Sequence, residues 1–268
     1  MSEASFLTPH RPRRFPMLRA VFALMLREMT TTYGRSPGGY FWAIAEPVAA
    51  IGLLSLAFSM FMRHPPLGQS FILFYATGFL PLAAYQHMSG NIGMAIRFSR
   101  PLLAYPTVTY FDAIVARFLL SIITQAVIFI IVIGGTILID DLELHINYIY
   151  IFRAAAMIIA FSSAVGLVNC YLMSIFPIWQ YVWSVLNRPL FLISGVLYLI
   201  DSLPEQGRSL ALWVPPAHFI SMMRAGFYDS YDAVYVSEIY IYGISLALGA
   251  LGMLLLHRYH QIILSERP

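Results

Sequence analysis

The chain has 268 residues, of which 59% are hydrophobic and only 11% are charged. A soluble domain usually carries roughly a quarter charged residues, so this composition excludes an ordinary soluble protein and predicts an integral membrane protein. The net charge is +3, with sixteen Arg and no Lys. Because the phosphate-binding P-loop requires a Lys, the chain cannot contain a standard ATP-binding P-loop, and an ATPase that drives it must be a second polypeptide.

The first forty residues are predicted to form a cytoplasmic tail and an interfacial helix. Residues 1–15 are polar and rich in Arg and Pro. Over 17–33, apolar residues recur at helical spacing, while Arg19, Arg27 and Thr30 share the opposite face. Since an Arg inside so short an apolar run disfavours a spanning helix, this segment is expected to lie in the plane of the membrane surface.

The predicted fold is an all-α membrane protein with six transmembrane helices in one domain over 41–260. The expected spans are 41–62, 71–96, 112–139, 147–176, 178–200 and 236–258. Trp42 begins the first span as an interfacial anchor. Residues 261–268 are expected to form a second cytoplasmic tail.

The distribution of arginines predicts that both termini are cytoplasmic, because inner segments are enriched in positive charge. The inner segments then carry the tail arginines and Arg97, Arg100, Arg117, Arg258 and Arg267, whereas the outer segments carry Arg63, Arg153, Arg208 and Arg224. Many carboxylates fall outside, namely Asp140, Asp141, Glu143, Asp201, Glu205, Asp229 and Asp232.

The main inner connection, 97–117, mixes apolar and basic residues between prolines. A short helix on the membrane surface would present Leu102, Leu103 and Tyr105 to a groove on a partner protein. The alternative is an ordinary basic loop whose side chains reach back to the headgroups.

The segment 201–235 is too long for a tight connection and too apolar for a plain loop. Pro215 and Pro216 separate two short apolar stretches, one ending at Val214 and one beginning at Ala217. This pattern predicts two short helices that dip into the outer leaflet, one on each side of the break. The alternative is an interfacial loop packed on a dimer surface.

Two charged residues fall inside predicted spans. A charge at membrane depth costs at least ~2.5–3.5 kcal/mol and usually faces a cavity or a partner. Arg188 in a transport path would attract phosphate or carboxylate groups; alternatively, the fifth span starts later and leaves Arg188 at the inner interface. Glu46 is expected to pair with Arg35 near the surface or to line a cavity.

The sequence contains no signature of an enzyme or a metal site. Cys170 is the single cysteine, and no CxxC or HExxH spacing occurs. Ser194, Gly195 and His218 suggest an intramembrane serine protease, but Leu192 replaces the first Gly of its GxSG motif. We therefore expect no catalytic group, no metal, no bound cofactor and no nucleic-acid partner.

Four stretches, in this order along the chain, resemble ABC-2 type permeases that export bacterial cell-surface polysaccharides, most of all the capsular branch. They are Tyr33–Pro47 in the first span, Arg100–Pro106 in the first cytoplasmic connection, Asn187–Val196 in the fifth span, and Trp213–His218 followed by Arg224. The last stretch is similar to the family's W-N-P-x-x-H element, with Val214 in place of its Asn.

The resemblance implies a homodimer in the bacterial inner membrane that engages two cytoplasmic ATPase subunits, on which ATP and Mg bind. Its coupling helix would lie in 97–110 with Arg100, Leu102, Leu103 and Tyr105. Its outer gate would lie in 201–235 with Trp213, Pro215, Pro216, His218 and Arg224. Capsule exporters also pass their glycan to a periplasmic co-polymerase and an outer-membrane export protein.

The functional hypothesis is ATP-driven export of a lipid-linked, acidic capsular polysaccharide. Trp42, Tyr85 and Tyr198 would stack sugar faces along the path, and Arg188 would attract acidic groups. The same fold with O-antigen, teichoic acid or a drug as cargo is the nearest alternative. A passive channel or a membrane scaffold is an alternative from another class, and it predicts no dependence on an ATPase.

Overall fold

The computed structural model describes residues 16–32, 39–103, 108–140 and 142–265, and within these ranges the chain is helical with no strand. In chain order the elements are α1 (Pro16–Thr32), α2 (Gly39–Ser59), α3 (Phe71–Gly93), α4 (Ala95–Leu103), α5 (Tyr110–Ile139), α6 (Tyr148–Ile175), α7 (Trp179–Ile193), the 3-10 turn η1 (Ile200–Ser202), α8 (Glu205–Ala211), α9 (Pro215–Phe227) and α10 (Glu238–Ser265).

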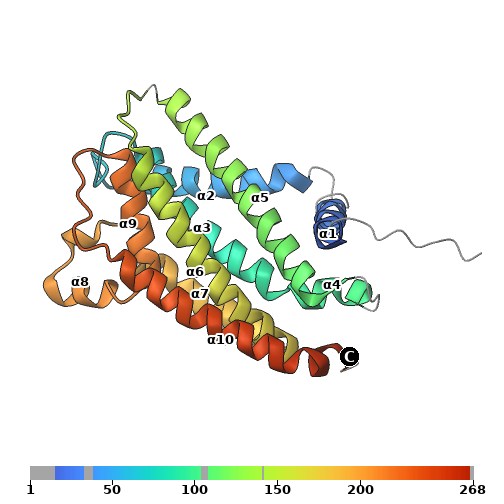
Figure 1. Ribbon diagram of the computed structural model, residues 1–268. Coiled ribbons are helices and arrows are strands. Elements are labelled where there is room, and N and C mark those ends of the chain that lie inside the picture. Colours follow the sequence, from blue (N-terminus) through green and yellow to red (C-terminus); the bar gives the residue numbers. More distant parts are fainter. Residues whose placement is uncertain (1–15, 33–38, 104–107, 141, 266–268) are drawn as a thin grey trace, which may run out of the picture.

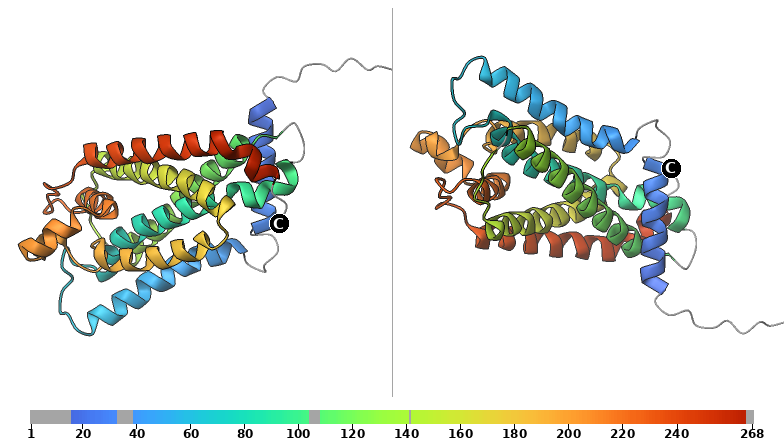
Figure 2. Two further views of the ribbon diagram at one scale, coloured as in Figure 1. Left: turned by 90° about the horizontal axis from the view of Figure 1, so that it is seen from below. Right: turned by 90° about the horizontal axis from the view of Figure 1, so that it is seen from above.

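The long helices run lengthwise in one bundle, and α1 lies across one end of it (Figures 1 and 2). That end, which we call the α1 end, also holds α4 and the last turns of α10. The opposite end, the α8 end, holds α8, η1 and the starts of α3, α6 and α10 (Figure 1). α1 crosses the bundle axis (Figure 2), while its predicted position along a membrane surface stays a prediction.

Local sequence signals explain where several helices begin. Ser70 caps α3 by accepting a hydrogen bond from the Leu73 backbone N–H at 3.1 Å. Thr109 and Asp112 form a reciprocal capping box at the start of α5. Pro215 stands in the first turn of α9, where a missing N–H costs nothing.

Among the described residues, four helices are long and apolar enough to cross a membrane: α2 over Phe41–Ser59, α5, α6, and α10 over Glu238–Ile263. They confirm the predicted first, third, fourth and sixth spans as membrane-capable helices. The predicted second and fifth spans correspond to α3 and α7, which run alongside the others (Figure 2) but do not meet the same criteria of length and apolarity; α7 has only 15 residues.

Three predicted boundaries are wrong. The expected second span, 71–96, breaks at Met94, so that α3 ends at Gly93 and α4 begins at Ala95. The expected fifth span, 178–200, ends at Ile193, because the chain turns at Gly195 with a φ of 80° that favours glycine. The expected tail 261–268 begins inside α10, which continues to Ser265.

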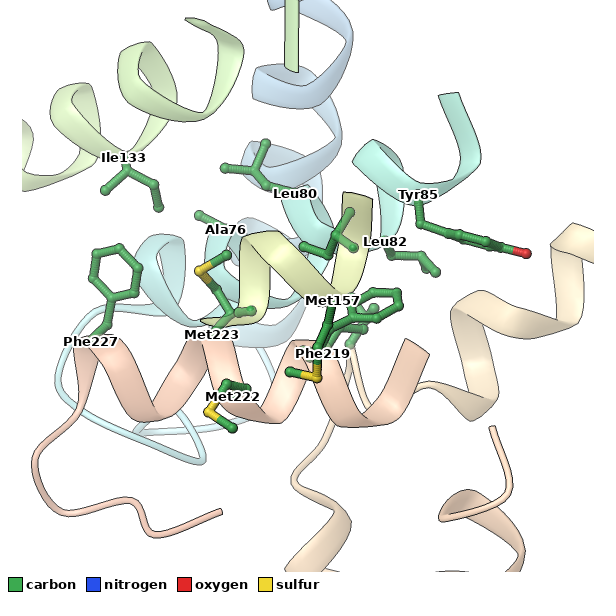
Figure 3. Packing of buried hydrophobic residues seen from close by; sticks show 14 of the residues in the cluster. Ala76, Leu80, Leu82, Tyr85, Ile133, Met157, Phe219, Met222, Met223 and Phe227 are labelled. Atoms are coloured by element: carbon green, nitrogen blue, oxygen red, sulfur yellow. The ribbon is translucent and has the colours of Figure 1, made fainter. Parts of the chain in front are cut away.

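The core is built around α3 and α6, and α9 packs against both of them. Every residue of α9 from Pro216 to Phe227 is buried. Figure 3 shows Phe219, Met223 and Phe227 of α9 gathered with Ala76 and Leu80 of α3 and Met157 of α6. In a bilayer such contacts stabilise through close packing, since lipid tails are as apolar as the core. The segment 201–235 therefore contains the two short helices predicted on either side of the prolines, and the second is a core element rather than a surface loop.

Candidate functional site

A buried ion pair connects four helices at the α1 end. Arg117 of α5 places its Nε 2.9 Å from Oε1 of Glu28 in α1, and both residues are at most 9% exposed. The Nη1 of Arg117 donates to the backbone carbonyl of Asn91 in α3 at 3.0 Å. The guanidinium carbon of Arg117 also lies 4.3 Å from the ring centre of Phe98 in α4. One side chain thus joins α1, α3, α4 and α5.

This connection is expensive to break. Removing one partner of a buried pair leaves an uncompensated charge and typically costs ~3–5 kcal/mol. Burial raises the pKa of the Glu28 carboxyl, and the adjacent Arg117 guanidinium opposes that rise. We infer that a displacement of α4 or α1 is passed to the membrane helices α3 and α5 rather than absorbed at this junction.

The structure places three of the four predicted coupling residues on α4, and Tyr105 lies outside the described residues. Leu102 packs partly against the cluster of Val21 and Leu24, and Leu103 packs partly against the cluster around Ile92. Both leucines are therefore engaged within the subunit and are less open to a partner's groove than expected.

The side chains of α4 that are open to a partner are mainly basic. Arg97 and Pro101 are exposed, and Arg100 is half-exposed. Sequence analysis assigned Arg97 to the inner side but not to the contact with a partner.

At the α8 end, Arg224 of α9 is buried and held by backbone carbonyls. Its Nη1 donates to the carbonyls of Gly195 at 2.7 Å and Tyr198 at 3.0 Å, and its Nη2 donates to Val196 at 2.9 Å. The guanidinium carbon lies 4.2 Å from the ring centre of Phe74 in α3. Arg224 was predicted as a gate residue on an outer segment; in the structure it pins the turn after α7 to α9 and α3.

His218 of α9 connects the residue that follows α8 to the residue that precedes α10. Its Nδ1 accepts from the Ser237 backbone N–H at 3.1 Å, so the proton resides on Nε2, which donates to the Leu212 carbonyl at 2.9 Å. Only the neutral ring satisfies both bonds. The imidazole thus links α8, α9 and the start of α10.

The remaining gate residues lie where the chain enters α9. Val214 is the N-cap residue of α9 and makes no side-chain cap, but its carbonyl accepts from Ala217 N–H at 3.0 Å. The Asn that Val214 replaces is therefore not needed to satisfy Ala217. Trp213 is exposed, and its backbone carbonyl accepts from the Tyr240 hydroxyl at 2.8 Å.

The four predicted path residues do not share a pocket within one subunit. Tyr85 is buried in the core and stacks on Phe161 at 5.3 Å between ring centres, a position that favours packing over sugar binding. Trp42 is exposed on α2, and Arg188 is exposed on α7. Tyr198 follows α7 and donates its hydroxyl to the Ile193 carbonyl at 3.1 Å.

Because α7 begins at Trp179, Arg188 lies well inside this helix. Its depth in a membrane, on which the two interpretations of Arg188 differ, stays a prediction. Arg35, the expected partner of Glu46, lies outside the described residues, while Glu46 itself is exposed and lines a groove with Trp42.

Sequence analysis missed the Glu28–Arg117 pair, although a signal was present. Glu28 stands seven residues after Val21 and four after Leu24, so it falls on the apolar face of α1 among residues that are buried. A carboxylate in that position requires a buried cation.

Residues 19–228 match the ABC-2 type transporter family. The chain belongs to the ABC-2 type transporter family. It is 27% identical over 241 residues to the capsule polysaccharide export inner-membrane protein CtrC of Neisseria meningitidis, covering 90% of this chain and 91% of CtrC. BexB of Haemophilus influenzae, which carries the same description, is also 27% identical with the same coverage. The polysialic acid transport protein KpsM of Escherichia coli is 28% identical over 92% of this chain and 95% of its own length.

Proposed function

We propose that the chain is the membrane permease subunit of an ATP-driven exporter of lipid-linked capsular polysaccharide in the bacterial inner membrane. The observation that carries the proposal is its similarity, over about nine-tenths of both chains, to family members named for export of capsule polysaccharide. One similar protein is named for transport of polysialic acid, an acidic glycan, which supports an acidic cargo.

The energy source is a pair of separate ATPase subunits that bind ATP and Mg. The chain itself has no Lys for a P-loop, so ATP is hydrolysed on another polypeptide, and the chain's membership of the ABC-2 type transporter family supports a role as the transport subunit. The ATPase docks at the α1 end, where α4 exposes its arginines, and this end and both termini are cytoplasmic. α3 and α7 complete a set of six spans, and α8 and α9 form a re-entrant gate segment.

The working unit is a homodimer that encloses the glycan path. α7 contains no buried residue within the described chain, yet it carries the exposed Arg188. A guanidinium at membrane depth faces protein or water rather than lipid. α2 and α7 lie on the side of the bundle away from α10 (Figure 2), and a second subunit facing them would cover Arg188 and create a watery path.

ATP-driven closure of the partner would push α4, and the Arg117 junction would pass the motion to α3 and α5. At the other end Arg224 makes the turn after α7 move together with α9. A periplasmic co-polymerase and an outer-membrane export protein then receive the glycan.

The first test is co-purification with the ATPase encoded beside this chain, using charge reversals on α4. Arg97→Glu with Arg100→Glu is expected to lower ATPase recovery at least about ten-fold, because rim charges steer and hold a partner. Arg208→Glu, at the α8 end, is the matched control and is expected to retain the ATPase. If only the Arg208→Glu variant loses the ATPase, the ATPase docks at the α8 end and the proposed orientation is reversed. If the wild-type chain forms no complex with the ATPase, a passive channel or scaffold is favoured.

A second test separates coupling from assembly. Glu28→Gln keeps the shape of the side chain but removes the counter-charge of Arg117, with an expected cost of ~3–5 kcal/mol. The complex should still form and hydrolyse ATP, while capsule exported per ATP falls several-fold. Glu205→Gln, an exposed change at the α8 end, should leave this ratio unchanged. An unchanged ratio in Glu28→Gln would remove the junction from the coupling route.

A further inference from the structure

A groove of about 470 Å³ with a mixed polar and apolar lining lies between α2, α3 and α5. We call it the α2–α3–α5 groove. Its polar and aromatic lining includes Trp42, Glu46, His87, Asn91, Thr124 and Gln125. Its volume falls in the range of small-molecule sites, roughly 300–1,000 Å³.

The groove lies among helices that are otherwise apolar. Glu46 belongs to the membrane-capable stretch of α2, and Thr124 and Gln125 belong to that of α5. The lining residues lie in the first half of α2, around the middle of α5 and, with His87 and Asn91, in the second half of α3, which places the groove near the middle of the bundle and toward the α1 end. Polar and ionisable side chains are costly against lipid tails, so this surface is matched to water or to a polar ligand.

The chemistry of the lining fits sugar hydroxyl groups. Trp42 is 61% exposed and offers an aromatic face on which the C–H groups of a sugar ring can pack. The amides of Asn91 and Gln125 and the hydroxyl of Thr124 supply both donors and acceptors for hydroxyl groups.

The charge of the lining selects against acidic groups. Glu46 contributes a carboxylate, and the described lining contains no Arg to balance a carboxylate or phosphate on a ligand. This differs from the surface around Arg188, which suits an anion.

We propose that the α2–α3–α5 groove binds an uncharged sugar unit of the lipid-linked cargo, with Trp42 as the stacking platform and Glu46 excluding acidic sugars. The inference rests on the proposed function and names which part of the cargo this surface takes. Recognition of charged and uncharged parts is thereby divided between two surfaces.

The groove is also joined to the coupling junction. The Asn91 side chain donates to the Ser121 hydroxyl at 3.1 Å, and its backbone carbonyl accepts from Arg117 at 3.0 Å. A ligand in the groove therefore contacts a residue that is bonded to the Glu28–Arg117 pair.

The test is protection of a cysteine placed in the groove, in the full complex with its ATPase in nanodiscs. Ala83→Cys puts a thiol in the lining, Val127→Cys puts one on the exposed face of α5 outside it, and the native Cys170 is buried. The probes share one tail: octyl glucoside has a neutral sugar head, octyl glucuronide an acidic one, and octanol no sugar.

We expect octyl glucoside to slow labelling of Ala83→Cys by a water-soluble thiol reagent at least about five-fold, and the other two probes less than about two-fold. Gln125→Leu should abolish this protection, whereas its neighbour change Val127→Leu should retain it. Glu46→Gln should let octyl glucuronide protect as well. Labelling of Val127→Cys should not respond.

Three results would overturn the inference: equal protection by octanol, equal protection by octyl glucuronide, or an Ala83→Cys thiol that is unprotected or never labelled. Capsule at the cell surface is measured in parallel in cells with the gene deleted and restored. If surface capsule requires the gene but Ala83→Cys is not protected as expected, the proposed function stands without this site. If Ala83→Cys is protected but surface capsule does not require the gene, the proposed function is contradicted.

Discussion

α7 and α9 are two short helices separated in the chain by η1 and α8, and they have opposite surroundings. α7 has 15 residues, α9 has 13, and each carries one arginine. All of α9 from Pro216 onward is buried, whereas no residue of α7 is. The difference shows that one helix completes the subunit, while the other presents a surface that the membrane or a second subunit must cover.

The two arginines follow the same division. Arg224 has carbonyl partners within the subunit, and Arg188 makes no hydrogen bond or ion pair among the described residues. Replacing each should therefore separate a role in folding from a role in transport. The chain contains a convenient reporter, since Cys170 is its single cysteine and its buried thiol reacts only when the core opens.

The largest expected effect on stability is from Arg224→Leu. It removes the donors to three buried carbonyls, and charge-assisted bonds are worth ~1.5–3 kcal/mol each, so we expect a loss of at least about 3 kcal/mol. The midpoint of thermal exposure of Cys170 should fall by at least about 6 °C. Arg188→Leu is the matched control. Equal midpoints in the two variants would show that Arg224 does not pin the turn.

A smaller loss is expected from Gly78→Ala in α3. An added Cβ would lie 2.8 Å from Arg224 Nη2 and 3.2 Å from Val196 Cα, and such overpacking costs ~1–3 kcal/mol. Gly90→Ala in the same helix meets no atom within 4 Å and should be neutral or stabilising by up to ~1 kcal/mol. The pair is compared by the same thiol assay. If both variants behave alike, the close approach of α9 to α3 is not maintained in the membrane.

The smallest effect on folding is expected from Arg188→Ala. An exposed change should alter stability by less than ~0.5 kcal/mol. Export of capsule should nevertheless fall at least about ten-fold, because an interaction of the charge with acidic groups is lost. Val185→Ala, an exposed change on the same helix, should export normally. Normal export by Arg188→Ala would remove this residue from the glycan path.

Much of the helix pattern could be predicted from the sequence because the apolar runs are long and separated by polar connections. The paired prolines correctly predicted the division between α8 and α9. Burial could not be predicted in the same way, since residues facing lipid and residues facing the core are equally apolar. Tyr85 was therefore expected to face a path, and α9 was not recognised as a buried core helix.

The candidate sites were predicted less well than the helices, for a related reason. The carbonyls that hold Arg224 lie 26 to 29 residues away in sequence, and Glu28 lies 89 residues from Arg117. Such pairings depend on which helices pack against each other, and no local sequence pattern predicts that packing. The position of Glu28 on an apolar face indicated that a partner was needed, but not which one.

The two apolar faces of α1 have different surroundings, one buried and one exposed. Val21 and Leu24 are buried against α5, while Leu18, Phe22, Leu26 and Met29 form an exposed stripe at helical spacing. We propose that this stripe lies at the boundary between headgroups and acyl chains, where the Glu28–Arg117 pair connects α1 to α5. A thicker or thinner bilayer would then displace α4 and α5 at the α1 end, where the ATPase is proposed to dock, so we expect lipid chain length to change the turnover of the proposed exporter.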